Sequence, residues 1–98
     1  MKYELEQTPE FKNWLTGRKV KPFKGRLLAR FERIRNGNFG DYKKISNEIF
    51  ELRFFFGSGF RVYYTIKNDC VVLLLVGGDK SSQTDDIEKA KQLLIEME

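Results

Sequence analysis

The stretch EIFELRFFFGSGFRVYYTIKNDCVVLLLVGG, residues 48–78, decides the fold. Apolar and polar side chains largely alternate in its first two segments, 48–56 and 60–67, which is typical of strands with one buried face. The turn residues Gly57-Ser58-Gly59 and Asn68-Asp69 separate these segments from each other and from a third. We therefore predict three strands in an antiparallel meander. The third, VVLLLV (71–76), is apolar throughout, so it should lie centrally or be covered on both faces.

Two helices are expected before this meander. The segment TPEFKNWL (8–15) places Thr8 at the N-cap and Pro9 at the first helical position, and Gly17 ends the helix. A second helix is predicted from about Pro22 to Asn36, where apolar residues recur at helical spacing. These are Phe23, Leu27, Leu28, Phe31 and Ile34. The short link between the two helices favours a helical hairpin.

A short strand and a third helix complete the chain. KYELEQT (2–8) alternates like a half-buried strand that joins the sheet, and SSQTDDIEKAKQLLIEME (81–98) has an apolar helical stripe. Ser82, followed by Asp85, resembles a capping box at the start of this helix. The order β-α-α-β-β-β-α predicts one α+β domain, residues 1–98, whose antiparallel sheet packs on one face against the helical hairpin and the C-terminal helix.

The composition excludes several classes of function. The 98 residues include no histidine and one cysteine, Cys70, which excludes Ser-His-Asp and Cys-His catalysis and leaves no set of zinc ligands. In GGDKSS (77–82), Asp79 stands where a phosphate-binding loop requires glycine before the lysine. No apolar run could span a membrane, and MKYELEQTPEF (1–11) has no features of a secretory signal. We therefore expect no metal, no cofactor, no membrane association and a location in the reducing cytoplasm.

The net charge of +4 is unevenly distributed along the chain. Residues 1–47 carry twelve Lys or Arg against five acidic residues, and residues 48–98 carry six against nine. The basic excess is densest between Arg18 and Arg35, and it suits a polyanion such as RNA or an acidic protein partner. An ordinary solvated helix face is the alternative. The candidate RNA- or ribosome-binding residues are Lys21, Lys24, Arg26, Arg30 and Arg33.

Strand alternation also predicts a cationic site on the meander. If the first two strands pair through the Gly57-Ser58-Gly59 turn, four polar side chains share one face of the sheet. These are Glu51, Arg53, Arg61 and Tyr63, and Lys80 follows the end of the third strand. Such a pocket suits phosphate. Simpler interpretations remain open: Gly77-Gly78 allows a tight exit with positive φ, Ser81 and Ser82 cap the last helix, and Glu51 forms a surface salt bridge with Arg53.

These segments resemble a known toxin family. IFELRFFFGSGFRVYY (49–64), VVLLLVGGDKSSQTDDIEKAK (71–91) and TPEFKNWL (8–15) are similar to the HigB-like "addiction module killer" toxins, a phage-derived family of the RelE/ParE superfamily. The resemblance covers almost the whole chain. It implies a RelE/ParE-like fold and the toxin of a type II toxin–antitoxin system, neutralised by a cognate antitoxin that is usually a helix-turn-helix protein. Related toxins enter the ribosomal A site and cut the mRNA there.

The resemblance places the basic groove of the family on Arg53, Arg61 and Lys80, with Glu51 and Tyr63 beside them. Cleavage would proceed by attack of the ribose 2′-OH on the adjacent phosphate, and the cations would stabilise the developing charge. Arginine stays protonated, so Glu51 is the candidate base by type, or else it orients Arg53. Lys80, if desolvated, is the candidate general acid.

The chain also departs from the family pattern. Many ribosome-dependent relatives place a His or Tyr near the chain end, whereas this sequence has no His and no Tyr after Tyr64. The group that transfers protons is therefore open. Two other functions stay possible at this point: a toxin of the same fold that inhibits a protein target such as DNA gyrase without catalysis, and a non-toxic basic binding module.

Overall fold

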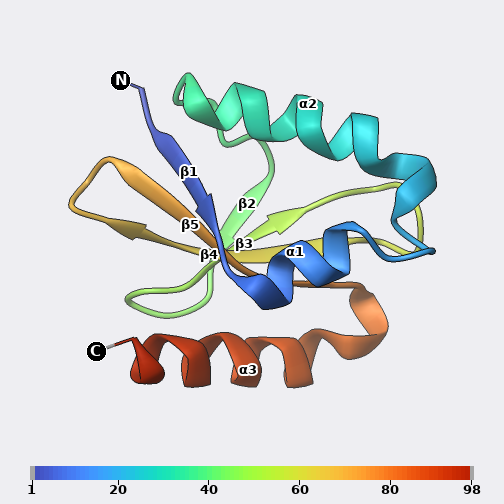
Figure 1. Ribbon diagram of the computed structural model, residues 1–98. Coiled ribbons are helices and arrows are strands. Elements are labelled where there is room, and N and C mark those ends of the chain that lie inside the picture. The colour runs from blue at the N-terminus through green and yellow to red at the C-terminus, as the bar shows by residue number, and fades with distance from the viewer. Residues whose placement is uncertain (1, 98) are drawn as a thin grey trace.

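The computed structural model describes residues 2–97 and shows a five-stranded sheet between helices (Figure 1). The strands are β1 (Glu4–Gln7), β2 (Tyr42–Lys44), β3 (Phe50–Arg53), β4 (Arg61–Lys67) and β5 (Val71–Gly78). The helices are α1 (Pro9–Leu15), α2 (Lys24–Arg35) and α3 (Gln83–Glu96), and the 3₁₀ turns η1 (Lys21–Phe23) and η2 (Lys80–Ser82) precede α2 and α3. The α+β class, the three-strand meander and the three helices are thus confirmed. Glu98, the predicted last residue of the third helix, lies outside the described residues.

The strand order is β1-β5-β4-β3-β2, which corrects the expected sheet in two ways. First, β1 pairs with β5 in parallel, so the sheet is mixed rather than antiparallel. Second, β2 was not predicted, because its three residues are all exposed and show no apolar alternation. Two of the three are lysines, a composition that protects an edge strand from pairing with other chains.

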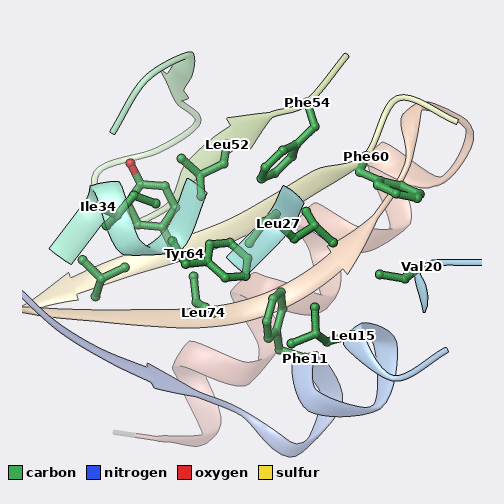
Figure 2. Packing of buried hydrophobic residues seen from close by; sticks show 13 residues of the cluster. Phe11, Leu15, Val20, Leu27, Ile34, Leu52, Phe54, Phe60, Tyr64 and Leu74 are labelled. Atoms are coloured by element: carbon green, nitrogen blue, oxygen red, sulfur yellow. The ribbon is translucent and has the colours of Figure 1, made fainter. Parts of the chain in front are cut away.

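The helices cover both faces of the sheet, whereas the sequence placed them on one. In Figure 1, α2 lies above the sheet, α3 lies below it, and α1 crosses in front of the strands. Phe11 of α1 packs against Phe31 of α2, so these two helices cover the same face. The main core forms under α1 and α2, with Phe11, Leu27 and Ile34 packed against Leu52 and Tyr64 (Figure 2). A smaller core under α3 joins Ala90 to Ile49, which precedes β3, and to the sheet residues Tyr63 and Leu75. Both faces of β5 are apolar, so α3 has to cover the face that α1 and α2 leave open. This agrees with the prediction that the strand is covered on both faces. Within residues 2–97 no helix has both the length and the apolarity to cross a membrane.

The beginnings of α1 and α2 explain how they reach the main core. The Thr8 hydroxyl accepts a hydrogen bond from the Phe11 amide (3.0 Å) and donates one to the Leu75 carbonyl (2.7 Å), so the predicted N-cap also joins α1 to β5. The second helix begins two residues later than expected, because residues 21–23 form η1.

Leu28, predicted to be part of the apolar stripe of α2, is 47% exposed. It lines a cleft of about 530 Å³ between β1, α1 and α2.

Gly77 and Gly78 are needed for space and not for a positive φ. The glycines with positive φ are Gly37, Gly40, Gly57 and Gly59. A Cβ on Gly77 would overlap the Trp14 indole, whereas a Cβ on Gly78 would meet the carboxylate of Asp86 on the other side of the sheet. The expected tight exit from the sheet is therefore a close approach of α1 and α3 to the backbone of β5.

Gly77→Ala should destabilise the protein by about 2–3 kcal/mol, because the rigid indole of Trp14 cannot move aside as a flexible side chain would. Gly25→Ala is the matched control, since no atom lies within 4 Å of its added Cβ and the position is helical. We expect Gly25→Ala to be neutral or to stabilise by up to about 1 kcal/mol. Urea unfolding of the two variants measures both effects. Equal stabilities would contradict this account of Gly77.

Candidate functional site

The ladder between β3 and β4 brings together the four predicted residues of the meander. Arg53 pairs with Arg61 and Glu51 pairs with Tyr63, so all four side chains lie on one face of the sheet. This is the face that α3 covers, because Tyr63 belongs to the core under that helix. The environments of the four side chains differ sharply, and these differences decide which of them can contact a ligand.

Glu51 and Tyr63 are closed off from solvent by the start of α3. Glu51 is 3% exposed, and its Oε2 accepts hydrogen bonds from the Tyr63 hydroxyl (2.9 Å) and from Nε2 of Gln83 (3.1 Å). Among the described residues Glu51 forms no ion pair with Arg53, so the expected surface salt bridge is wrong. The carboxylate instead ties the first residue of α3 to the middle of the sheet. Gln83 could not be found by sequence reasoning, because its role depends on how α3 lies across β3 and β4.

Arg61 is also buried, at 2% exposure. Its Nη1 donates to the carbonyls of Phe54 (3.2 Å), Gly59 (3.2 Å) and Phe60 (3.0 Å), and its Nε is buried without a partner. This guanidinium therefore closes the turn between β3 and β4 from inside. Its positive charge has no acidic counterpart within salt-bridge distance among residues 2–97. The positive charge of Arg61 is therefore available to attract an anion at the surface of the β3–β4 turn.

Arg53 and Lys80 are the accessible cations of the site. Arg53 is half-buried at the end of β3, and Lys80 is exposed at the start of η2, so the expected desolvation of Lys80 is wrong. The methylenes of Lys80 pack over Gly59, where an added Cβ would lie 3.1–3.3 Å from them. Because Arg61 binds the Gly59 carbonyl, the three cations gather around one turn.

Asp79 fixes the position of Lys80. The Asp79 carboxylate accepts hydrogen bonds from the amide (2.9 Å) and hydroxyl (2.6 Å) of Ser81 and from the hydroxyl of Ser58 (2.9 Å). The hydrogen bonds from Ser81 and then Ser58 hold the pKa of Asp79 below its ordinary value. Asp79 and Ser82 form the capping box of η2, which corrects the box predicted for Ser82 and Asp85. The Asp-x-x-Ser spacing was a signal that could have located it.

Ser82 nevertheless stands at the N-cap position of α3, as predicted, although its side chain makes no capping bond there. Its hydroxyl donates to the carboxylate of Asp86 instead (2.6 Å). Burial raises the pKa of Asp86, and the hydrogen bond from Ser82 opposes that shift. The polar residues that follow β5 therefore form one linked turn. It joins the β3–β4 hairpin at one end and α3 at the other.

The basic residues of η1 and α2 form a second cationic surface beside the site. Lys21, Lys24, Arg26 and Arg33 are exposed, and the Arg26 guanidinium lies 4.3 Å from the centre of the Phe56 ring. A shallow groove of about 290 Å³ separates this helix from the end of β3. Its lining residues are Arg26, Ala29, Arg30, Arg33, Phe54 and Phe56. Arg26, Arg30 and Arg33 therefore line this groove from one face of α2.

Arg30 differs from its neighbours on that face, because its donors are used by the fold. Its Nη1 donates to the Arg53 carbonyl (2.8 Å), and its Nη2 donates to the carbonyls of Phe39 (3.1 Å) and Asp41 (2.7 Å). Burial lowers the pKa of Arg30, while the nearby charge of Asp41 opposes this shift and that of Arg33 adds to it. The side chain connects α2 to the chain on either side of β2.

The buried tyrosines predict how stability changes in alkali. Burial raises the pKa of Tyr63, its hydrogen bond to Glu51 raises it further, and burial also raises the pKa of Tyr64. A tyrosine whose pKa is higher in the folded chain stabilises fully below about pH 10, and this contribution is lost as the pH rises above that value. The free energy of unfolding should therefore fall by about 1.4 kcal/mol per pH unit for each of the two.

Urea unfolding of Tyr63→Phe between pH 9 and 12 tests this expectation. The free energy of unfolding of this variant should fall less steeply with pH, by the contribution of one tyrosine. This holds whatever the stability of the variant at pH 8. Tyr64→Phe is the parallel variant, because burial also raises the pKa of Tyr64, and it should reduce the pH dependence by a similar amount. A Tyr63→Phe slope equal to that of the parent protein would show that ionisation of Tyr63 does not oppose folding.

Comparison with known proteins places the chain in a family. A family model described as "Phage derived protein Gp49-like" matches residues 20–95, which include every residue of the candidate site. An uncharacterized protein of Haemophilus influenzae is 43% identical over 97 residues, which are 99% of this chain and 98% of that protein. The chain belongs to the Gp49-like family of phage-derived proteins, a toxin-type family of the RelE/ParE-like group.

Proposed function

We propose that this chain is the HigB-like toxin of a type II toxin–antitoxin pair and that it cleaves mRNA on the ribosome, in the cytoplasm. Membership of a toxin-type family supports the toxin part of this proposal. The observation that carries the cleavage part is the gathering of Arg53, Arg61 and Lys80 around the β3–β4 turn. Three cations without an acidic ion-pair partner among residues 2–97 suit a phosphate group whose negative charge increases during reaction.

The proposed reaction uses the nucleophile that RNA itself carries. The ribose 2′-oxygen forms a bond to the adjacent phosphorus, the bond to the 5′-oxygen breaks, and the products are a 2′,3′-cyclic phosphate and a free 5′-hydroxyl. Arg53 and Lys80 contact the phosphate from the surface, and Arg61 adds its charge from beneath the turn. The Lys80 ammonium gives a proton to the leaving 5′-oxygen. The proton of the 2′-OH passes to a base.

Glu51 is the candidate base on this chain, with Tyr63 as its partner. In the structure both are covered, and Gln83 occupies the carboxylate. Glu51 therefore reaches a 2′-OH only when the first turn of α3 moves away from β3. Glu51→Gln should lower the rate of cleavage if the carboxylate takes the proton, and Glu51→Gln together with Gln83→Ala should then be no faster. Restored activity in the double variant would assign Glu51 to holding α3.

The exposed basic residues of η1 and α2 are proposed to bind RNA phosphates of the ribosome or an acidic segment of the cognate helix-turn-helix antitoxin. Lys21, Lys24, Arg26 and Arg33 are available for this role. Arg30 supports the surface from below, because three carbonyls occupy its donors. Binding through phosphates weakens steeply with salt, so the affinity for ribosomes should fall as ionic strength rises.

One observation favours a second candidate function, inhibition of a protein target such as DNA gyrase without catalysis. Glu51 and Tyr63, the groups of the site other than Lys80 that could transfer a proton, are both covered by α3. A closed site of this kind would suit a toxin that acts by binding alone.

An in vitro translation reaction with primer extension on the mRNA, run with and without ribosomes, separates the two candidates. Cuts at a fixed position within codons that require ribosomes would support the interferase. Intact mRNA, together with broken or relaxed plasmid DNA in a parallel gyrase reaction, would support the alternative and overturn the proposal.

A further inference from the structure

Phe55 is an exposed aromatic residue between two buried ones. Phe54 is 1% exposed, and Phe56 is half-buried and stacks on Phe23 with ring centres 5.5 Å apart. Phe55 is 80% exposed and forms no aromatic pair among the described residues. A single exposed apolar side chain is common on a protein surface, so a role for Phe55 has to be argued from its surroundings.

The backbone around Phe55 is held rigidly from both sides. Arg30 binds the carbonyl of Arg53 (2.8 Å), and Arg61 binds the carbonyl of Phe54 (3.2 Å), the group directly bonded to the Phe55 nitrogen. Gly57, two residues further on, has a φ of 63° and lies against the Phe60 ring. Phe55 is therefore presented to solvent on a fixed backbone, which lowers the entropy lost when a ligand is bound.

The charges near Phe55 favour a nucleic acid over an apolar protein surface. The Cα atoms of Arg53 and Phe55 are at most about 7 Å apart along the chain. Lys80 packs over Gly59 of the same turn, and Arg26 lies over the ring of Phe56. Asp79, the carboxylate that reaches this turn through Ser58, accepts three hydrogen bonds. Aromatic rings among cations are how single-stranded nucleic acids are bound, with bases stacked on the rings and phosphates near the cations.

We propose that Phe55 is the platform on which a base of the mRNA stacks, next to the phosphate that Arg53 and Lys80 contact. This inference rests on the proposed function, and it assigns the positioning of the substrate to a residue that performs no chemistry. The Phe55 ring can hold the base of a nucleotide while Arg53 and Lys80 hold the phosphate of the same nucleotide. Stacking also differs between bases, so Phe55 would set part of the preference for the cut site.

Three variants test this role in a translation reaction in which the mRNA cuts are mapped and their rates measured. Phe55→Tyr keeps a flat ring, Phe55→Leu keeps an apolar side chain without a ring, and Phe55→Ala removes both. We expect Phe55→Tyr to stay within about 3-fold of the parent rate. Phe55→Leu and Phe55→Ala should each lose about 10- to 100-fold, the range for loss of one stacked base. Their cut-site maps should also discriminate less between purines and pyrimidines.

The outcomes separate this inference from the function on which it rests. If the parent protein makes no cuts, the proposed function fails. The parent protein alone decides this point, so no variant is needed for it. If the parent cuts and Phe55→Leu cuts equally fast, stacking is overturned. Should Phe55→Leu also keep antitoxin binding that Phe55→Ala loses, Phe55 is an apolar anchor for protein. Thermal melting of each variant checks the fold, which an exposed side chain should not alter by more than about 0.5 kcal/mol.

Discussion

Arg53→Gln should lower the rate of mRNA cleavage in a translation reaction by about 100-fold or more. The guanidinium of Arg53 makes no hydrogen bond or ion pair among residues 2–97, so it is free to contact the phosphate, and Gln removes the charge while keeping a polar side chain. Loss of one donor placed to meet charge that develops in the transition state has an effect of this size. The stability of the protein should change little, because the backbone carbonyl of Arg53, and not its side chain, is what Arg30 binds.

Arg35→Gln is the matched control for this prediction. Arg35 lies near the end of α2, is exposed and pairs with Glu32 on its own helix (3.1 Å), away from the β3–β4 turn. Its replacement removes the same net charge, so any general effect of charge on ribosome binding appears in both variants. We expect the control to cleave within about 2-fold of the parent. Equal losses in the two variants would show that Arg53 acts only through net charge.

Arg30→Lys should lower the free energy of unfolding by about 2–4 kcal/mol. The guanidinium serves three carbonyls in two directions, whereas the single ammonium of lysine cannot reach all of them. Each buried carbonyl left without a donor costs about 1–3 kcal/mol. For a domain of this size, the melting temperature should fall by more than about 8 °C.

Arg33→Lys, on the same face of α2 but exposed, is the control for Arg30→Lys. It should change stability by no more than about 0.5 kcal/mol. The comparison distinguishes a residue that holds the fold from one that is available to RNA, although the two have the same type and lie three positions apart. If the two variants melt at the same temperature, the bonds of Arg30 to the carbonyls do not stabilise the protein.

The parts of the fold that were predictable from sequence are those in which neighbouring residues determine structure. The alternation along β3 and β4 and the turn at Gly57-Ser58-Gly59 set the pairing of Arg53 with Arg61, which the register confirms. The N-cap at Thr8 is equally local. The edge strand β2 was not predictable, because its exposed residues leave no periodic pattern, and the parallel partner of β1 lies about two-thirds of the chain away.

Burial of the site was harder to predict, because it depends on contacts between distant segments. Glu51 and Arg53 share a face of one strand, but only Glu51 lies under the first turn of α3. Arg26 and Arg30 share a face of one helix, but only Arg30 meets the carbonyls beside β2. In each pair both residues are charged and share one face of their element, so no local pattern separates the side chain that faces solvent from the one that does not.

The parallel pairing of β1 with β5 has a consequence for biosynthesis. Glu4 lies opposite Val71, so β1 stays unpaired after its synthesis until β5 has emerged from the ribosome. Nascent chains and premature termination products that stop before β5 lack the strand that completes the sheet. They also lack Lys80, which follows that strand. The order of synthesis should therefore keep the sheet and the candidate site incomplete in the polysome until β5 has been made.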